Sequence, residues 1–256
     1  MIKEESRFTN STVFEGMTSI RAILDGIKEN KPNARKIEEI LYDKDKEKSK
    51  YKEIGYLKKM GELFNFPVRS TTNEEIETYS IGASHGGIIA LCHEKQYDEL
   101  STDKIKENGF YVMLEGIEDP YNFGYALRSI YASGADGIIL SKRNWLSAAG
   151  VVCRSSAGAS ERLDVFIAND DFISCFKEKG YKIVCADIKN SISVYESDLK
   201  KPIFLIVGGE KRGISSSVLS QADQIVRIEY GRDFSAALSA ASASTILAFE
   251  VFKQNK

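Results

Sequence analysis

The second half of the chain alternates short apolar runs with helix-like segments, and this alternation constrains the fold more than any other feature. Apolar runs typical of buried strands lie at residues 110–114, 137–140, 163–166, 182–186, 203–207 and 224–228. Helix-like segments separate most of these runs, at residues 125–133, 147–153, 171–179 and 215–221, and a long helix follows the last run. Strands and helices that alternate in this way form a parallel sheet with helices on both faces. The sequence therefore predicts an α/β fold.

The N-terminal part of the chain predicts a smaller α/β domain. Its pattern indicates helices at 18–28 and 53–64 and strands near 36–42, 67–70 and 87–92. Residues 96–108 are polar and charged, which is typical of a linker. We therefore expect an N-terminal domain at 1–95, a linker at 96–108 and a second domain at 109–256.

Composition narrows the class of protein. The 256 residues are 43% hydrophobic and 28% charged, which suits a globular protein with two domains. No apolar run approaches the ~20 residues that cross a bilayer, and the first residues lack the apolar core of a signal peptide, so we expect a cytoplasmic protein without a membrane partner. The four cysteines and two histidines have no zinc-site spacing, which predicts buried free thiols and no metal.

Charge is unevenly distributed along the chain. The net charge of −2 gives no global attraction for nucleic acid, so a polyanionic partner must bind a local basic patch. Residues 28–59 contain eleven Lys or Arg against seven Asp or Glu. This segment is either a solvated surface of mixed charge or a contact for RNA phosphates.

The first candidate motif follows the apolar run at 110–114. Asp119-Pro120 predicts a turn, and the helix after it carries Asn122 near its start and Arg128 in its first turns. Polar residues where a strand passes into a helix are a common place for chemistry in α/β proteins. The structural alternative is that Asn122 only caps the helix and that Arg128 only pairs with a surface carboxylate.

The second candidate motif is the glycine-rich turn Gly208-Gly-Glu210-Lys-Arg-Gly213, which follows the apolar run at 203–207. Its glycines allow a ligand to approach the backbone closely. The spacing of Gly208 and Gly213 matches a P-loop, but Ile214 stands where the phosphate-binding lysine belongs. Glu210 suits the positioning of a hydroxyl or an arginine, and the turn could equally be a tight structural corner.

The third candidate motif lies where the last strand passes through a polar loop into a helix rich in Ala and Ser. Small residues on nearly every turn allow close packing against another backbone or a thin ligand. Much of this helix fits a tightly packed core. The N-terminal turn of the helix is the part that we assign to a ligand.

Together these segments resemble the SpoU/TrmH family of the SPOUT methyltransferases over about residues 109–253. The family's first motif, Asn-x-Gly followed by Arg, matches Asn122, Gly124 and Arg128. Its second, Gly-x-Glu-x-x-Gly, matches Gly208, Glu210 and Gly213. Its third ordinarily reads Ser-Leu-Asn, and here the matching residues are Ala237, Leu238 and Ser239.

The resemblance implies a fold and an assembly that periodicity does not suggest. It implies that the parallel sheet of the C-terminal SPOUT domain contains a deep trefoil knot, in which the methyl donor binds, and that the protein is a homodimer. The segments Gly16-Met-Thr-Ser-Ile-Arg21 and Ser84-His85-Gly86-Gly87 are similar to the ribosomal-protein-like, RNA-binding domain that many members carry at the N-terminus.

The resemblance also implies an activity, the transfer of a methyl group from S-adenosylmethionine to a ribose 2′-hydroxyl of ribosomal or transfer RNA. By matched position, the catalytic residues are Asn122, Arg128 and Glu210. The residues expected to bind the cofactor S-adenosylmethionine are Gly208, Ile228, Leu238 and Ser239.

Two other functions stay open at this point. The altered third motif allows a catalytically inactive RNA-binding member of the same fold. The turn from Gly208 to Gly213 also allows a different nucleotide-dependent enzyme. The sequence does not identify the RNA or the nucleotide that is modified.

Overall fold

The computed structural model describes residues 12–31, 33–81, 85–141, 148–209 and 212–256. Its contacts divide the chain into two compact units. The N-terminal unit comprises Met1–Gln96 and Asn144–Arg162, and the C-terminal unit comprises Tyr97–Arg143 and Leu163–Lys256. A segment from the expected domain at 109–256 therefore groups with the N-terminal unit.

A four-stranded sheet forms the centre of the N-terminal unit, in the order β1-β4-β2-β3. Its strands are β1 (Val13–Glu15), β2 (Ile37–Asp43), β3 (Val68–Thr71) and β4 (Ile88–Cys92). Only β2 and β3 run parallel to each other, and the other neighbours are antiparallel. The helices of this unit are α1 (Gly16–Lys28), α2 (Tyr51–Phe64), α3 (Asn73–Tyr79), α5 (Ala149–Ser155) and α6 (Ala159–Arg162).

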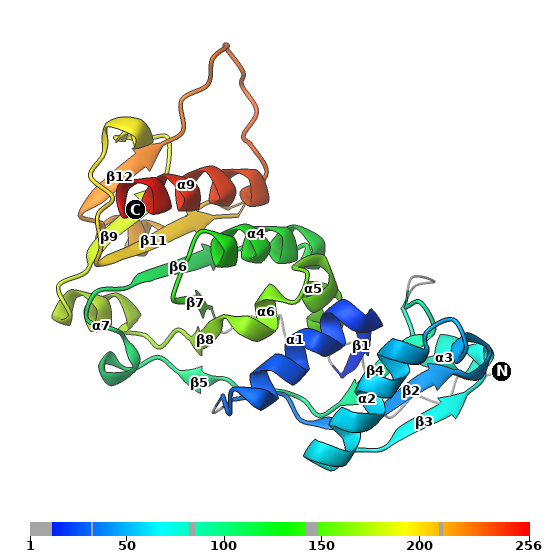
Figure 1. The fold of residues 1–256 in the computed structure, drawn as a ribbon. Coiled ribbons are helices and arrows are strands. Elements are labelled where there is room, and N and C mark those ends of the chain that lie inside the picture. The colour runs from blue at the N-terminus through cyan, green and yellow to red at the C-terminus, as the bar shows by residue number, and fades with distance from the viewer. Residues whose placement is uncertain (1–11, 32, 82–84, 142–147, 210–211) are drawn as a thin grey trace. The chain divides into compact units, whose positions relative to one another are not determined.

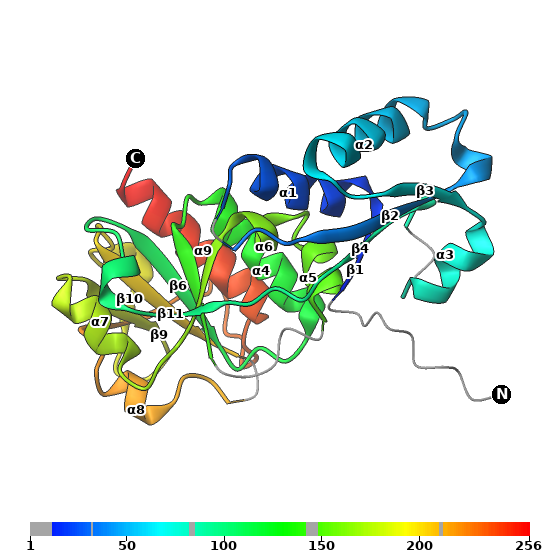
Figure 2. The same ribbon diagram turned by 90° about the horizontal axis from the view of Figure 1, so that it is seen from below.

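Alternation along the central strands explains how the helices pack on this sheet. Ile88 and Ala90 of β4 belong to the core cluster that includes residues of α1 and α2. Ile89 and Leu91 point the other way and pack with Ile76 of α3. Accordingly, α1 and α2 lie on one side of the sheet and α3 lies on the other (Figure 2).

Ion pairs bind α5 and α6 to the rest of the N-terminal unit. The carboxylate of Glu161 lies 3.0 Å from Nη2 of Arg35 and 3.7 Å from Nζ of Lys95, and the Arg35 and Glu161 side chains are buried. Arg154 of α5 pairs with the buried Glu15 at 2.7 Å. These contacts explain why a segment distant in sequence groups with this unit.

The C-terminal unit contains an eight-stranded sheet in the order β10-β12-β9-β11-β6-β7-β8-β5, and every pair of neighbours is parallel. This confirms the predicted parallel sheet. The strand β5 comes from the expected linker at 96–108. The strands are β5 (Asp98–Glu99), β6 (Phe110–Glu115), β7 (Gly137–Leu140), β8 (Asp164–Ile167), β9 (Lys182–Ala186), β10 (Ile192–Ser193), β11 (Ile203–Gly208) and β12 (Gln224–Arg227).

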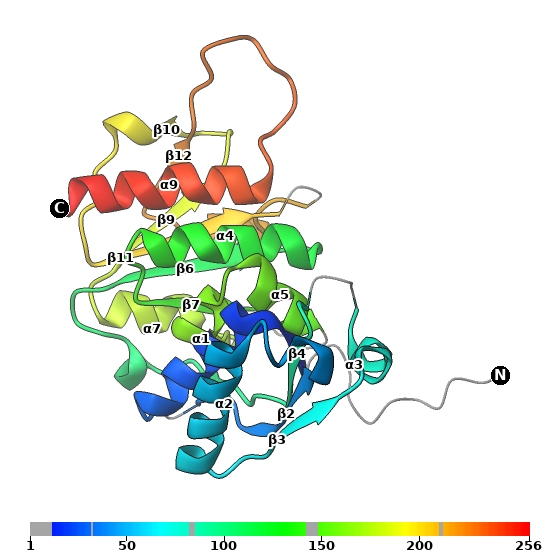
Figure 3. The ribbon, with the colours of Figure 1, turned by 45° about the vertical axis from the view of Figure 1, so that its right-hand side comes forward.

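Helices pack against the strands of this sheet. The helices are α4 (Pro120–Ala132), α7 (Phe172–Glu178), α8 (Ser216–Leu219) and α9 (Ala240–Gln254). Phe176 of α7 and Val218 of α8 join Tyr111 and Phe204 of the strands in one buried cluster. The helices α4 and α9 lie side by side, and α9 contacts β11 (Figures 1 and 3).

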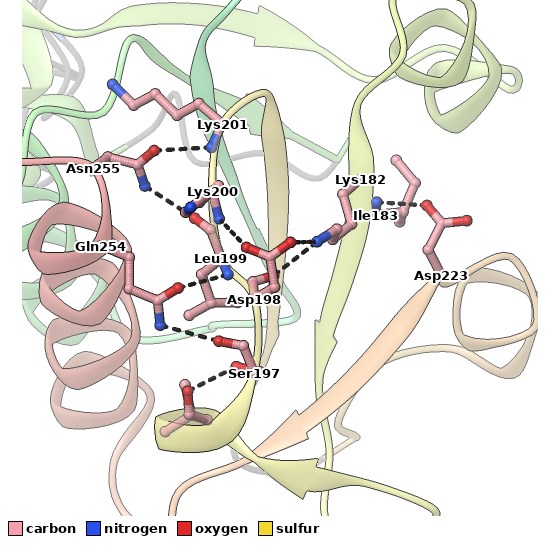
Figure 4. A network of polar contacts seen from close by, with 11 residues as sticks. Lys182, Ile183, Ser197, Asp198, Leu199, Lys200, Lys201, Asp223, Gln254 and Asn255 are labelled. Carbon is pink, nitrogen blue, oxygen red and sulfur yellow. Dashed lines mark hydrogen bonds and ion pairs between the residues drawn. The ribbon is translucent and has the colours of Figure 1, made fainter.

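Hydrogen bonds fasten the C-terminal end of α9 to the segment that precedes β11 (Figure 4). The Gln254 side chain accepts a hydrogen bond from the backbone N–H of Leu199 at 2.8 Å. The Asn255 side chain accepts one from the N–H of Lys201 at 2.9 Å and donates one to the carbonyl of Leu199 at 3.0 Å. These hydrogen bonds therefore hold the C-terminal end of α9 against the segment before β11, within the C-terminal unit.

Three general findings concern the described part of the chain. None of its helices has the length and apolar character needed to cross a membrane. It also contains no group of three or more His, Cys, Asp or Glu side chains that could hold a metal ion. The four cysteines are free, and Cys92, Cys153 and Cys185 are buried.

Candidate functional site

The helix α4 carries the first motif, and it begins earlier than the sequence pattern predicted. Asp119 caps the helix by accepting hydrogen bonds from the N–H groups of Tyr121 at 2.6 Å and Asn122 at 3.2 Å. Pro120 occupies the first helical turn, where its missing N–H and fixed φ are tolerated. Asn122 therefore lies inside the first turn, and the interpretation that it caps the helix is wrong.

Asn122 and Arg128 are placed differently on this helix. Arg128 is exposed and Asn122 is half-buried, and no described residue makes a hydrogen bond or ion pair with either side chain. Six helical residues correspond to a rotation of about 120° between side chains and a rise of about 9 Å. Because helical side chains lean toward the N-terminus, helix geometry predicts that the long Arg128 side chain leans toward the N-terminal end of α4.

The glycine-rich turn of the second motif leaves the sheet beside the first motif. Gly208 at the end of β11 lies in register with Glu115 at the end of β6. The N–H of Gly209 donates to the Glu115 carbonyl at 2.5 Å, and the N–H of Gly213 donates to the Gly209 carbonyl at 3.0 Å. The Glu115 carboxylate accepts a hydrogen bond from the N–H of Ser215 at 3.3 Å. The structure thus brings the first two motifs to one edge of the sheet.

Close packing explains the glycine at 208. A Cβ atom at this position would lie 2.6 Å from the carbonyl carbon of Gly213, which is closer than real Cβ atoms approach. Gly213 therefore lies directly against Gly208, and residue 208 must lack a side chain. The other predicted residue of this motif, Glu210, lies outside the described residues.

A cavity of about 480 Å³ opens where β9, β12 and the loop before α9 meet. Two of the predicted cofactor-binding residues, Ile228 and Leu238, line it, whereas Gly208 and Ser239 are absent from its described wall. The residues that line the cavity are Ala186, Asp187, Ile188, Val226, Arg227, Ile228, Glu229, Tyr230, Phe234, Ala237 and Leu238.

The loop between β12 and α9 is held together by its own contacts, although it extends away from the sheet (Figure 3). The hydroxyl of Tyr230 accepts a hydrogen bond from the N–H of Leu238 at 3.1 Å. The rings of Tyr230 and Phe234 lie 6.1 Å apart. These contacts join the two ends of the loop and place its aromatic side chains at the cavity.

Ser239 caps the last helix. Its hydroxyl accepts a hydrogen bond from the N–H of Ser242 at 3.2 Å, at the start of α9. Asn and Ser cap helices about equally well, so Ser239 can cap this helix as an Asn at the same position would. The helix that Ser239 caps is also linked to α4, because Thr245 donates to the hydroxyl of Ser129 at 2.7 Å.

Sequence reasoning missed the part of the cavity wall after β9 and gave no role to the aromatic residues in the loop of the third motif. Asp187 and Ile188 directly follow β9, and Tyr230 and Phe234 lie in the loop after β12. Ligands in open α/β sheets bind outside the carboxyl ends of the strands. Applied to the correctly predicted strand at 182–186, that rule would have indicated Asp187 and Ile188.

Comparison with known proteins shows the family to which the chain is related. Residues 109–249 match the model of the SpoU rRNA Methylase family. The chain belongs to this family. The matched residues include every residue of the three candidate motifs and the whole described wall of the cavity.

Relatives of known name agree with this membership. The chain is 31% identical over 166 residues to a Staphylococcus saprophyticus protein whose name places it in the TrmH family of tRNA/rRNA methyltransferases, a match covering 64% of this chain and 63% of the relative. It is 27% identical over 206 residues to the 23S rRNA (guanosine-2′-O-)-methyltransferase RlmB of Shewanella oneidensis, covering 77% of this chain and 82% of the relative.

Solved structures show the same fold. The AdoMet-bound rRNA methyltransferase from Sinorhizobium meliloti matches with a TM-score of 0.77 and 22% identity, over 94% of this chain and 87% of the other. The SpoU methyltransferase AviRb from Streptomyces viridochromogenes, in complex with AdoMet, also matches with a TM-score of 0.77, at 21% identity over 94% of this chain and 89% of the other. The predicted α/β SPOUT fold is therefore confirmed at the level of the parallel sheet.

Proposed function

We propose that this SpoU-family protein transfers a methyl group from S-adenosylmethionine to a ribose 2′-hydroxyl of RNA. The observation that carries the proposal is the cavity at the carboxyl ends of β9 and β12, which is lined by Ile228 and Leu238. It lies within the stretch that matches the SpoU family model. The RlmB relative is named for methyl transfer to a guanosine 2′-oxygen of 23S rRNA.

The chemistry of the cavity suits the proposed donor. Its volume of about 480 Å³ is within the ordinary range for small-molecule sites. Ile228, Leu238 and Phe234 offer apolar surface to a flat base, and Asp187 and Glu229 offer acceptors to hydroxyl and amino groups. S-adenosylmethionine supplies an electrophilic methyl group on a sulfonium. Gly208 and Ser239 would contact the donor at the edge of the cavity, through backbone and hydroxyl groups.

Arg128 is the residue that we assign to the reaction itself. A ribose hydroxyl is a poor nucleophile at neutral pH, so the site must orient it and favour the loss of its proton. A guanidinium keeps its proton in proteins, so Arg128 acts as a positive charge that holds a phosphate or stabilises the developing alkoxide. Asn122, one helical turn or more away, and Glu210 would orient Arg128 and the ribose.

The N-terminal unit would bind the RNA substrate, which we expect to be ribosomal or transfer RNA. The RNA-binding domain that the sequence predicts at 1–95 forms most of this unit, and its likeness to a ribosomal-protein domain also belongs to this proposal. Support comes from cations beside aromatic rings: Lys28 lies 5.1 Å and Arg21 5.6 Å from the centroid of the Tyr56 ring. Such combinations suit contact with phosphates and bases.

The trefoil knot and the homodimer also belong to the proposal. Strand β11 lies between β6 and β9 although it follows both in the chain, and α9 then packs against α4, which is consistent with a threaded connection. Exposed aromatic side chains on α4 and α9 offer an apolar surface to a second copy: Tyr121, Tyr125, Phe249 and Phe252. We place the protein in the cytoplasm, where its RNA substrate would be found.

Calorimetric titration with S-adenosylmethionine is the first test. We expect one donor per subunit, followed by transfer of a labelled methyl group to unmodified RNA and loss of that transfer when the ribose is 2′-O-methylated beforehand. Failure of the folded protein to bind the donor, alone and with RNA present, would favour an inactive RNA-binding protein.

The variant Arg128→Ala separates catalysis from binding. Because Arg128 lies outside the described wall of the cavity, the donor Kd should stay within a few-fold of wild type while turnover falls by about 10² or more. Arg128→Lys keeps the charge but not the fork of donors, and should recover part of the turnover. Unchanged turnover in Arg128→Ala would remove this residue from the mechanism.

A further inference from the structure

Asp187 is the charged residue at the carboxyl end of β9, and it lines the cavity. Its backbone N–H donates to the carbonyl of Val226 in β12 at 3.1 Å, which fixes its position between two parallel strands. Its Oδ1 atom accepts a hydrogen bond from the N–H of Lys189 at 3.0 Å. The side chain is therefore held by the turn that follows β9.

The charges around the cavity single out this carboxylate. Three charged residues line the cavity, and two of them pair with each other: Nη2 of Arg227 lies 3.0 Å from Oε1 of Glu229. Arg227 also donates to the carbonyl of Ser191. Among the described residues, no cation pairs with Asp187, and its Oδ2 atom has no hydrogen-bond donor. The Asp187 carboxylate, which lines the cavity, can therefore accept further hydrogen bonds from a ligand.

A carboxylate in this position is suited to a ribose diol. In dinucleotide-binding folds, an acidic residue near the strand ends binds the ribose hydroxyls of the ligand, because each hydroxyl donates a charge-assisted hydrogen bond. Here the apolar side chains of Ile188 and Phe234 line the same cavity and offer a surface to the attached base.

Distance argues against a contact with the sulfonium. The reacting end of the donor must lie near Arg128, on the helix that follows β6. Strand β11 separates β9 from β6, so Asp187 stands two strand spacings, about 10 Å, from the end of β6. This offset places Asp187 at the nucleoside end of a donor that extends along the sheet edge.

We propose that Asp187 binds the ribose hydroxyls of S-adenosylmethionine and makes the cavity selective for a ribonucleoside donor. This inference rests on the proposed donor site. Asp187 is then a specificity residue that contacts the donor, and it takes no part in proton transfer.

The test compares the wild-type protein with Asp187→Asn in calorimetric titrations of S-adenosylmethionine and S-adenosylhomocysteine. The amide keeps an acceptor for Lys189 but loses the charge, so both ligands should bind roughly 10- to 100-fold more weakly. The matched control is Asp223→Asn, because the Asp223 carboxylate also accepts a backbone hydrogen bond, from Ile183 at 2.8 Å, but lies outside the cavity wall. Its donor affinity should not change.

Ligand analogues keep the test independent of the folding of the variant. The 2′-deoxy and 3′-deoxy forms of S-adenosylhomocysteine should bind wild type at least tenfold more weakly than the parent compound. The same affinity for all three forms would overturn the inference, as would an Asp187→Asn variant with unchanged affinity. A loss confined to S-adenosylmethionine would assign the carboxylate to the sulfonium and also overturn it. Absence of any donor binding by wild type would instead refute the proposed function.

Discussion

The buried carboxylate of Glu161 allows a prediction whose size follows from the structure. Glu161 accepts hydrogen bonds from Nη2 of Arg35 at 3.0 Å and from Nε of Arg35 at 3.3 Å, and Lys95 lies 3.7 Å away. The Arg35 and Glu161 side chains are only 1% and 3% exposed. Glu161→Gln removes the charge that both cations face, and breaking such a buried pair costs about 3–5 kcal/mol.

The stabilisation by the ion pairs of Glu161 depends on pH in a definite direction. Burial alone would raise the pKa of Glu161, but the neighbouring charges of Arg35 and Lys95 outweigh burial and lower the pKa below its ordinary value. The unfolded chain therefore binds this proton at a higher pH than the folded protein does. The stabilisation is fully present above the ordinary glutamate pKa, and it is lost as the pH falls through the lowered pKa. The difference between wild type and Glu161→Gln should shrink in acid.

Guanidinium unfolding followed by circular dichroism measures the effect, and hydrogen exchange of peptides from α1 and α6 locates it. The matched control is Glu47→Gln, because Glu47 also pairs with a lysine, Lys58 at 3.2 Å, but both side chains are about half exposed. Solvent screens that pair, so the control should scarcely move the unfolding midpoint. Equal midpoints for the two variants, or a loss independent of pH, would refute the reasoning.

Three further predictions concern the C-terminal unit. Ser239→Ala should destabilise the protein by about 1 kcal/mol in denaturant unfolding because it removes the cap of α9, whereas Ser239→Asn should be nearly neutral; equal losses would contradict the capping role. Gly208→Ala should lower the free energy of unfolding by about 1–3 kcal/mol because the added Cβ would lie 2.6 Å from Gly213. As a control, Gly55→Ala in α2, where no atom lies within 4 Å of the added Cβ, should raise it by up to about 1 kcal/mol. Asn255→Ala should speed hydrogen exchange at the end of α9, because it removes the hydrogen bonds to the segment before β11; unchanged exchange would show that they do not anchor the helix.

Strands were easier to predict than helix boundaries. The runs at 110–114 and 203–207 are apolar throughout because both faces of a parallel sheet are covered, and β6 and β11 match them within one residue. The start of α4 was predicted too late because Asp119-Pro120 also signals a turn. The same pair is a cap followed by a proline in the first turn, which starts a helix.

Some elements had signals that periodicity does not capture. The helix α3 has a single buried apolar residue, Ile76, so no apolar stripe indicates it. Its start is nevertheless encoded, because Thr72 accepts a hydrogen bond from the N–H of Glu75 at 3.3 Å, as a helix N-cap does. The two-residue strands β5 and β10 have no periodicity at all and depend on the neighbouring strand for their pairing.

The candidate site was predictable to the extent that it depends on backbone geometry. Ile228 and Leu238, which the motifs singled out, line one cavity, since both lie where a strand or loop ends at the same sheet edge. The predicted strand at 182–186 puts Asp187 at a strand end, but its place in the cavity wall also depends on β9 and β12 being neighbours. Which strands lie side by side is a property of the whole chain and cannot be read from one segment.

The grouping of Asn144–Arg162 with the N-terminal unit has a consequence for how this chain can be divided. Neither unit is a continuous stretch of sequence. A gene fragment that ends at residue 96 would encode the small sheet without Cys153, which fills its core, and without Glu161, which neutralises Arg35 and Lys95. A fragment that starts at residue 97 would contain Cys153 and Glu161 without the core, Arg35 and Lys95 that they contact. Recombination at a single breakpoint therefore cannot exchange the N-terminal unit for another, and a transplant must move two segments together.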